Sequence, residues 1–243
     1  MTEFTLGPGS APDVLWWGTE PVLACRLGDP TKPGTLSVFN RSGYLIDFPV
    51  YAGPGWPRLC LSAGRAYLGF NNGRDGIVLV NDTGQTSVLT GSTRGNQPVM
   101  FGAPDVYWQQ DAPTYPIARR PITGGPIELV GTGAPTGLAY VACDGRIVTV
   151  DENRLSVPGM LDPVRSGDVI VGTCLGSAPV PFVAVQLGSD QIRMLWLGKD
   201  SQNPRCAVGP NGDTLIAAWG AQGVRVGLYT PHELRALPYA STP

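Results

Sequence analysis

A chain of 243 residues with 42% hydrophobic residues is long enough to bury a core and too apolar to be intrinsically disordered. Charged residues make up 15% and the formal net charge is −2, so the chain lacks the basic excess with which nucleic-acid-binding proteins neutralise phosphates. Gly (33) and Pro (24) are spread along the whole chain, which indicates many short strands joined by tight turns.

The first residues, with an early Glu3, lack the basic and apolar regions of a secretory signal. The longest uncharged run, residues 169–189, has the length of a membrane span. Pro179 and Pro181 in its middle instead predict two buried strands and a turn. We therefore expect no membrane insertion, and a location in the cytoplasm or in a virion.

Period-two alternation and short runs of β-branched or aromatic residues recur along the chain and predict β-strands. Turn signals such as Asn72-Gly73 and Asn211-Gly212 bound them. In chain order the predicted strands lie within residues 13–17, 35–39, 58–62, 66–70, 76–80, 105–109, 127–130, 138–142, 146–150, 168–172, 181–187, 191–197, 213–219 and 224–229.

The C-terminal region carries the one helix signal. Thr230 is suited to be an N-cap, Pro231 to the first helical position, and Glu233 to closing a capping box. This pattern predicts a short helical turn over residues 231–237. A last strand through residues 233–237 is the alternative.

An internal repeat indicates the architecture. Residues 56–91 return in altered form as residues 203–238; the copies align on Pro57 and Pro204, and each continues with an arginine, Arg58 or Arg205. Units of about 40 residues with about four short strands each are typical of β-propeller blades, because a single blade cannot bury both of its faces. The sequence predicts an all-β, single β-propeller domain over residues 1–243 with six blades, with repeats beginning near residues 13, 58, 97, 137, 168 and 205. Five blades, or a β-sandwich, are the alternatives.

The segments SAGRAYLGF with GIVLV, and PNGDTLIAAW with GVRVGLY, resemble degenerate repeats of the sialidase-like or lectin-like propeller superfamily. The resemblance covers residues 56–91 and 203–238, and residues 97–130 more loosely. The Ser-x-Asp-x-Gly-x-x-Trp pattern of that family is not intact, because the second segment keeps Gly212 and Trp219 but places its acid differently. The resemblance implies a propeller architecture rather than an activity.

The sequence contains no recognisable catalytic constellation. The single histidine, His232, has no nucleophile motif beside it, and a catalytic zinc site would need several histidines. Phosphate-binding and calcium-binding loop patterns are absent. The five cysteines form no close pair and are expected to be buried apolar residues in a reducing compartment: Cys25, Cys60, Cys143, Cys174 and Cys206. We therefore expect no enzymatic activity, no metal and no cofactor.

The predicted loops supply candidate binding residues. An exposed aromatic side chain beside short polar groups suits the stacking and orientation of a sugar or a protein partner. The candidates are Trp56, Arg74, Asp75, Asn96, Asp111, Tyr115 and Asp200. The six tryptophans lie mostly in predicted strands and are expected mainly in the core.

These observations favour a structural or interaction module without enzymatic activity. The low charge and the Pro- and Gly-rich loops fit an accessory component of a large assembly, such as the head, neck or tail of a bacteriophage virion, with other protein subunits as partners. The alternative is a glycan-binding, lectin-like propeller whose partner is a cell-surface glycan. A glycoside hydrolase or sialidase comes third, and nucleic acid is not an expected partner.

Overall fold

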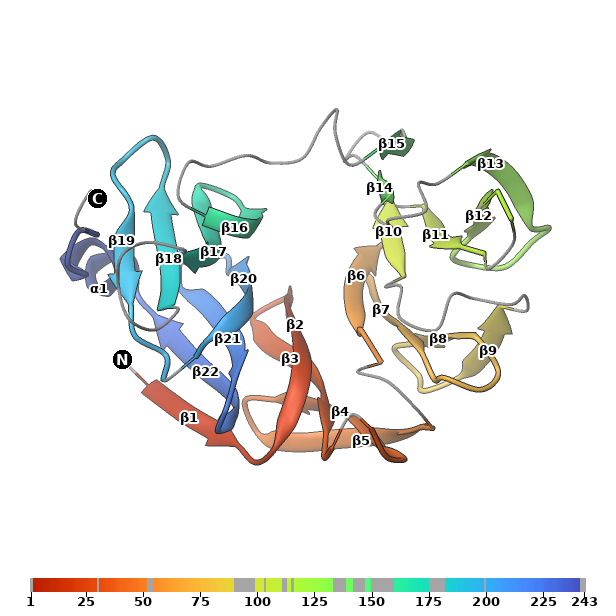
Figure 1. Ribbon diagram of the computed structural model, residues 1–243, viewed down its shortest axis with the longest axis horizontal. Coiled ribbons are helices and arrows are strands. Elements are labelled where there is room, and N and C mark those ends of the chain that lie inside the picture. The colour runs from red at the N-terminus through yellow and green to blue at the C-terminus, as the bar shows by residue number, and fades with distance from the viewer. Residues whose placement is uncertain are drawn as a thin grey trace. The chain divides into compact units, whose positions relative to one another are not determined.

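In the computed structural model, β-strands form most of the chain and one short helix lies near the C-terminus (Figure 1). The chain divides into two compact units, each considered by itself: Met1–Asp29 with Ser37–Asp47 and Leu155–Pro243, and Pro30–Leu36 with Phe48–Arg154. The structure describes residues 2–29, 31–51, 55–89, 99–102, 104–110, 113–114, 116–132, 139–141, 147–149, 160–174, 182–198 and 200–240.

The first unit contains two complete four-stranded antiparallel sheets. One has the strand order β1-β22-β21-β20, with β1 (Thr2–Leu6), β20 (Gln202–Val208), β21 (Thr214–Gly220) and β22 (Gly223–Tyr229). The other has the order β16-β17-β18-β19, with β16 (Met160–Ser166), β17 (Val169–Cys174), β18 (Phe182–Leu187) and β19 (Arg193–Leu195). The N-terminal strand thus completes a sheet whose other three strands come from the C-terminal end.

Two further four-stranded sheets belong to the second unit. They are β6 (Arg58–Ser62), β7 (Arg65–Asn71), β8 (Ile77–Asn81) and β9 (Thr86–Leu89), then β10 (Met100–Gly102), β11 (Asp105–Gln109), β12 (Pro116–Pro121) and β13 (Glu128–Thr132). The same unit contains the pair β14 (Ala139–Val141) and β15 (Ile147–Thr149). The remaining sheet runs β2 (Gly9–Trp17), β3 (Glu20–Leu27), β4 (Gly34–Asn40) and β5 (Gly43–Val50).

In these sheets, β1 apart, strands that follow one another in sequence are hydrogen-bonded neighbours, which is the strand order of a propeller blade. The predicted fold class, an all-β propeller with one short helix, is therefore confirmed. The number of blades, and the extension of a single domain over the whole chain, stay predictions.

Apolar side chains join neighbouring sheets within each unit. In the first unit, Val171 and Val185 belong to the same buried cluster as Ile216 of the next sheet. In the second unit, Leu79 of β8 and Trp108 of β11 share another cluster. In both pairs each sheet covers apolar surface of the other, because a single four-stranded sheet cannot bury both of its faces alone.

The sequence repeat is also a repeat of backbone conformation. Ala11, Trp56 and Asn203 each precede a proline and have positive φ angles of 50°, 42° and 47°. Arg58 and Arg205, which follow two of these prolines, each donate a hydrogen bond from Nη1 to the carbonyl oxygen of that proline, over 2.8 and 3.0 Å. In β2 and β20 the strand register shifts at the proline, as in a β-bulge, which is one of the few places where a sheet accepts proline.

The C-terminal helix forms as its sequence predicts, and the alternative of a last strand there is wrong. Helix α1 spans Pro231–Ala236. The Thr230 hydroxyl accepts a hydrogen bond from the backbone N–H of Glu233 over 3.3 Å, and the Glu233 carboxylate accepts one from the backbone N–H of Thr230 over 2.8 Å. This reciprocal pair is the predicted capping box.

Two other expectations concern buried segments. Within the long uncharged run, β17 and β18 form as expected, whereas residues 175–181 lie outside the described residues. Among the described residues, no helix is long and apolar enough to cross a membrane. Four of the cysteines are buried and have free thiols, as expected, whereas Cys143 lies outside the described residues: Cys25, Cys60, Cys174 and Cys206.

Candidate functional site

The structure describes four of the seven predicted binding residues, namely Trp56, Arg74, Asp75 and Asp200, and their grouping with the others into one site stays a prediction. Asn96, Asp111 and Tyr115 lie outside the described residues. Asp200 belongs to the first unit, where it is half-buried in a turn with a φ of 59°. The other three belong to the second unit.

In the second unit, the predicted residues are engaged with their neighbours. Arg74 and Asp75 form an ion pair with 3.8 Å between Nε and Oδ1, and the Arg74 guanidinium lies 5.1 Å from the centre of the Tyr51 ring. Asp75 also accepts a hydrogen bond from Asn72 Nδ2 over 2.9 Å. Trp56 is half-buried at the bend before its proline. None of these residues lines the cleft that follows.

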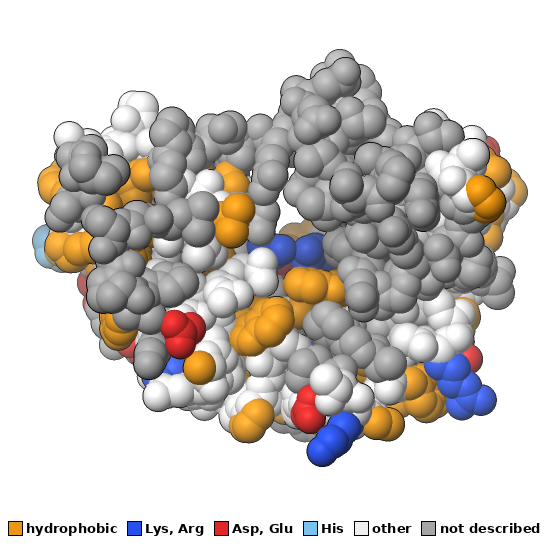
Figure 2. Space-filling model, in the orientation of Figure 1, with side chains coloured by type: hydrophobic (Ala, Val, Ile, Leu, Met, Phe, Trp, Pro, Cys, Tyr) orange, Lys and Arg blue, Asp and Glu red, His pale blue; other side chains and the backbone are white. Residues whose placement is uncertain are grey.

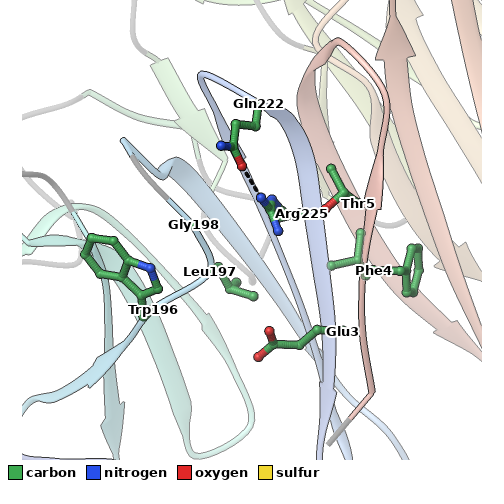
Figure 3. A pocket seen from close by; sticks show the side chains of 9 residues that line it. Glu3, Phe4, Thr5, Trp196, Leu197, Gly198, Gln222 and Arg225 are labelled. Atoms are coloured by element: carbon green, nitrogen blue, oxygen red, sulfur yellow. Dashed lines mark hydrogen bonds between the residues drawn. The ribbon is translucent and has the colours of Figure 1, made fainter.

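A cleft of about 450 Å³ lies in the first unit between β1, β22 and the segment after β19 (Figure 3). We call it the β1–β22 cleft. It is lined by Glu3, Phe4, Thr5, Trp196, Leu197, Gly198, Gln222, Arg225 and Val226.

Strand pairing decides which side chains of β1 face this cleft. In the antiparallel register, Thr5 lies opposite Arg225 of β22, and Glu3 lies opposite Gly227. Because alternate residues of a strand share a face, Glu3 and Thr5 point to one side of the sheet and Phe4 to the other. Figure 3 shows this arrangement, with the Phe4 ring on the far side of β1 from Trp196. The strand therefore contributes a carboxylate and a hydroxyl to the cleft.

The carboxylate of Glu3 is held from the core side. The buried Tyr229 hydroxyl donates a hydrogen bond to Glu3 Oε1 over 2.8 Å. Tyr229 reaches this position only because residue 227 is glycine, since a Cβ at Gly227 would lie 2.3 Å from the Tyr229 hydroxyl oxygen. Burial, the larger cause, and the hydrogen bond to Glu3 together raise the pKa of Tyr229 well above its ordinary value. The phenol therefore stays protonated and remains a hydrogen-bond donor.

Arg225 is held between the turn that joins β21 to β22 and the backbone at Gly198. Its Nη2 donates a hydrogen bond to Oε1 of Gln222, in the turn between β21 and β22. A Cβ at Gly198 would lie 3.2 Å from Arg225 Nε, so the guanidinium packs directly on backbone there. Ser201 Oγ donates to the carbonyl oxygen of Gly198 over 3.0 Å and holds that turn. The Arg225 guanidinium and the Gln222 amide are therefore held together by their hydrogen bond.

Trp196 supplies the aromatic side chain that faces the cleft, and the residue is 58% exposed. Its neighbours Leu195 and Leu197 are each 2% exposed, so the segment alternates between the core and solvent. Figure 3 shows Trp196 across the cleft from Glu3 and Arg225. The expectation that tryptophans lie mainly in the core is wrong for this residue, although period-two alternation along residues 193–197 was a signal that could have found it.

The cleft thus combines a flat apolar surface with fixed polar groups of balanced charge. Glu3 and Arg225 carry opposite charges, and Gln222 and Thr5 add neutral donors and acceptors. Glu3 is the one carboxylate among the nine lining residues. Elsewhere in the described ranges, no group of three or more His, Cys, Asp and Glu side chains is placed to hold a metal ion. These features suit binding of a ring-shaped, uncharged polar molecule.

No protein-family model and no curated protein matches this chain. Among solved structures, TolB from Acinetobacter baumannii is similar with a TM-score of 0.49 and 15% identity over 86% of this chain and 64% of that chain. A variant of the GH43 protein BlXynB from Bacillus licheniformis gives a TM-score of 0.46 and 10% identity over 100% of this chain and 60% of that chain. A glycosyl hydrolase from Bacteroides ovatus gives a TM-score of 0.43 and 10% identity over 97% of this chain and 87% of that chain. The chain therefore spans less than two thirds of the length of TolB and BlXynB.

These comparisons correct one prediction. The sequence was expected to encode a protein without enzymatic activity, but many of the similar structures are GH43 glycoside hydrolases, among them a xylan beta-1,4-xylosidase from Bacillus halodurans. The missing motifs therefore do not exclude an enzyme. At these identities and TM-scores the likeness concerns the arrangement of strands, and the activities are statements about the matched proteins.

Proposed function

We propose that this protein is a carbohydrate-recognition module and that the β1–β22 cleft binds an uncharged glycan. The observation that carries the proposal is Trp196, an aromatic residue 58% exposed in a cleft that also holds a fixed pair of planar polar groups. A tryptophan in solvent exposes a large apolar face, and a sugar ring offers a matching face of C–H groups with hydroxyls at its rim.

The polar groups support the same ligand class. Sugar hydroxyls both donate and accept hydrogen bonds, and the cleft offers both kinds of partner through Glu3, Gln222 and Arg225. Glu3 is oriented by Tyr229, and Arg225 by Gln222, so neither side chain has to be ordered by the ligand. Pre-organised groups lose less conformational entropy on binding.

Charge balance favours an uncharged sugar over an acidic one. Among the described residues of the lining, the positive charge of Arg225 is matched by the negative charge of Glu3. An acidic sugar would bring its carboxylate near that of Glu3, and like charges at short range repel.

The test is titration of the purified chain with neutral xylo-, cello- and galacto-oligosaccharides, followed by calorimetry and by tryptophan fluorescence. We expect saturable binding that Trp196→Ala weakens about tenfold, the order expected for loss of an aromatic stacking contact. Trp17→Ala is the matched control, because Trp17 is 41% exposed and does not line the cleft. Equal affinity of the two variants would contradict the proposal, and release of reducing sugar during the titration would show hydrolysis in addition to binding.

A second candidate function, favoured by a different observation, is attachment to other protein subunits of a large assembly such as a bacteriophage particle. Leu129 of β13 is 64% exposed and Val88 of β9 is 44% exposed, and both strands are the outermost of their sheets. Exposed hydrophobic side chains appear on the visible face in Figure 2. Apolar residues on open sheet edges favour protein contacts.

This candidate is tested on native source material by density-gradient sedimentation, with the chain followed by mass spectrometry. Co-sedimentation with megadalton particles that survives a salt wash supports it. Recovery at the mass of the chain alone contradicts it.

A further inference from the structure

A second cleft, of about 330 Å³, lies in the second unit between the sheet β6–β9 and the sheet β10–β13. We call it the β8–β12 cleft. It shares no residue with the β1–β22 cleft and differs from it in charge. Its lining consists of Arg65, Tyr67, Leu79, Asn81, Gln85, Thr86, Ser87, Arg120, Ile122 and Thr123.

Arg120 lies on the face of β12 that also carries core residues. In β12 it is paired in register with Val106, which is fully buried, and Ile122, two residues further on, is 4% exposed in the same core. Arg120 Nε is buried and has no hydrogen-bond partner among the described residues. A guanidinium at the edge of a low-dielectric region is stabilised strongly by a counter-charge.

The neighbouring arginine shows the contrast. Arg119 faces the other side of β12, where it pairs with Glu128 and lies 3.9 Å from Asp105, measured between Nε and Oδ2. Arg120 has no such ion pair within the described ranges. Among the described residues, acids therefore neutralise Arg119 but not Arg120.

The rest of the lining adds donors and no acid. Arg65 is neutralised by Asp82, with Nε 3.1 Å from both carboxylate oxygens and Nη2 2.8 Å from Oδ1. The described lining contains no Asp or Glu, while Gln85, Ser87 and Thr123 add amide and hydroxyl donors. Among the residues that the structure describes, no acid therefore compensates the positive charge of Arg120 in this cleft.

We infer that the β8–β12 cleft binds an oxyanion, that is, a carboxylate, sulfate or phosphate group of a small ligand, with Arg120 as its principal ligand. Guanidinium groups bind such anions through paired, charge-assisted hydrogen bonds. Hydroxyls of the surrounding serine and threonines complete the coordination of the anion oxygens. This site is independent of the proposed glycan site.

The test measures the melting temperature of the purified chain against increasing sulfate, phosphate or acetate, with chloride adjusted to constant ionic strength. We expect a saturable rise for the wild type, because a ligand that binds only the folded state stabilises it. Arg120→Gln should require at least about tenfold more anion for half of the effect, since it removes a charge-assisted contact. The anion with the strongest effect identifies the group, with acetate standing for carboxylates.

Arg119→Gln is the matched control, since it removes the neighbouring charge outside the cleft and should keep the wild-type response. If Arg120→Gln does not fold, Gln85→Glu takes its place as the test variant. It puts an acid in the lining of the cleft and should abolish the rise in melting temperature with added anion. Sulfate stabilises many proteins without binding to them, so an equal rise in the wild type and in Arg120→Gln overturns the inference. Absence of a saturable rise in the wild type with all three anions overturns it as well.

Discussion

Replacing Gly227 by alanine tests how the core controls the β1–β22 cleft. An added Cβ would lie 2.3 Å from the Tyr229 hydroxyl oxygen and 2.5 Å from two ring carbons, distances that real Cβ atoms do not adopt. Tyr229 is fully buried, so its ring cannot move aside without disturbing the cluster around Ile216 and Leu234. The substitution therefore forces either a strained core or a displaced tyrosine.

The magnitude follows from two contributions. Overpacking of a core costs about 1–3 kcal/mol. Loss of the hydrogen bond from Tyr229 to Glu3 adds about 1 kcal/mol. We expect Gly227→Ala to lower the free energy of unfolding by about 2–4 kcal/mol. The sign of this change in the free energy of unfolding is informative, because replacing a strand glycine by alanine without a clash raises that free energy by roughly 0.5–1 kcal/mol.

Urea unfolding followed by circular dichroism measures this difference. Tyr229→Phe, which removes only the hydroxyl, should cost about 1 kcal/mol, because the exposed Glu3 carboxylate regains water. Gly7→Ala is the control, since nothing lies within 4 Å of a Cβ at that position. If Gly227→Ala is as stable as Gly7→Ala, the argument that glycine is required beneath Tyr229 is refuted.

Three further predictions concern other parts of the first unit. Burial raises the pKa of the Cys25 and Cys206 thiols to about 12, so their contribution to stability is complete below about pH 9 and is lost as the pH rises toward 12. At pH 8 mass spectrometry should find both alkylated only after unfolding, and rapid labelling of the folded chain would contradict this. Arg193→Gln should speed amide exchange in residues 235–240, because the Arg193 guanidinium hydrogen-bonds two backbone carbonyls there and the Tyr239 hydroxyl; unchanged exchange would contradict that role. Thr230→Ala should lower the free energy of unfolding by about 1 kcal/mol through loss of the helix cap, whereas Thr230→Ser should stay near the wild type in the same urea assay.

The fold class was predictable because its signals are local. Alternation and turn dipeptides lie within single hairpins, and the Pro57 and Pro204 alignment marks a bend that both copies keep. Strand β1 was not predicted, because the short segment Thr2–Leu6 becomes a strand by pairing with β22 near the other end of the chain. No local pattern reports such a distant partner.

The candidate site was not predictable in the same way. The predicted binding residues lie in loops, whereas the β1–β22 cleft takes most of its polar side chains from strands and a two-residue turn. Glu3 and Arg225 lie far apart in the sequence and meet only through the strand register. Trp196 is expected in the core because it lies in a predicted strand, but its side chain faces solvent, whereas those of Leu195 and Leu197 are buried.

The pairing of β1 with β22 also has a consequence for biosynthesis. During synthesis Glu3 emerges before Trp196, and Arg225 on β22, the strand that pairs with β1, emerges after both. The β1–β22 cleft therefore cannot form until β22 has been synthesised and has paired with β1, so the proposed ligand would report that this pairing is complete.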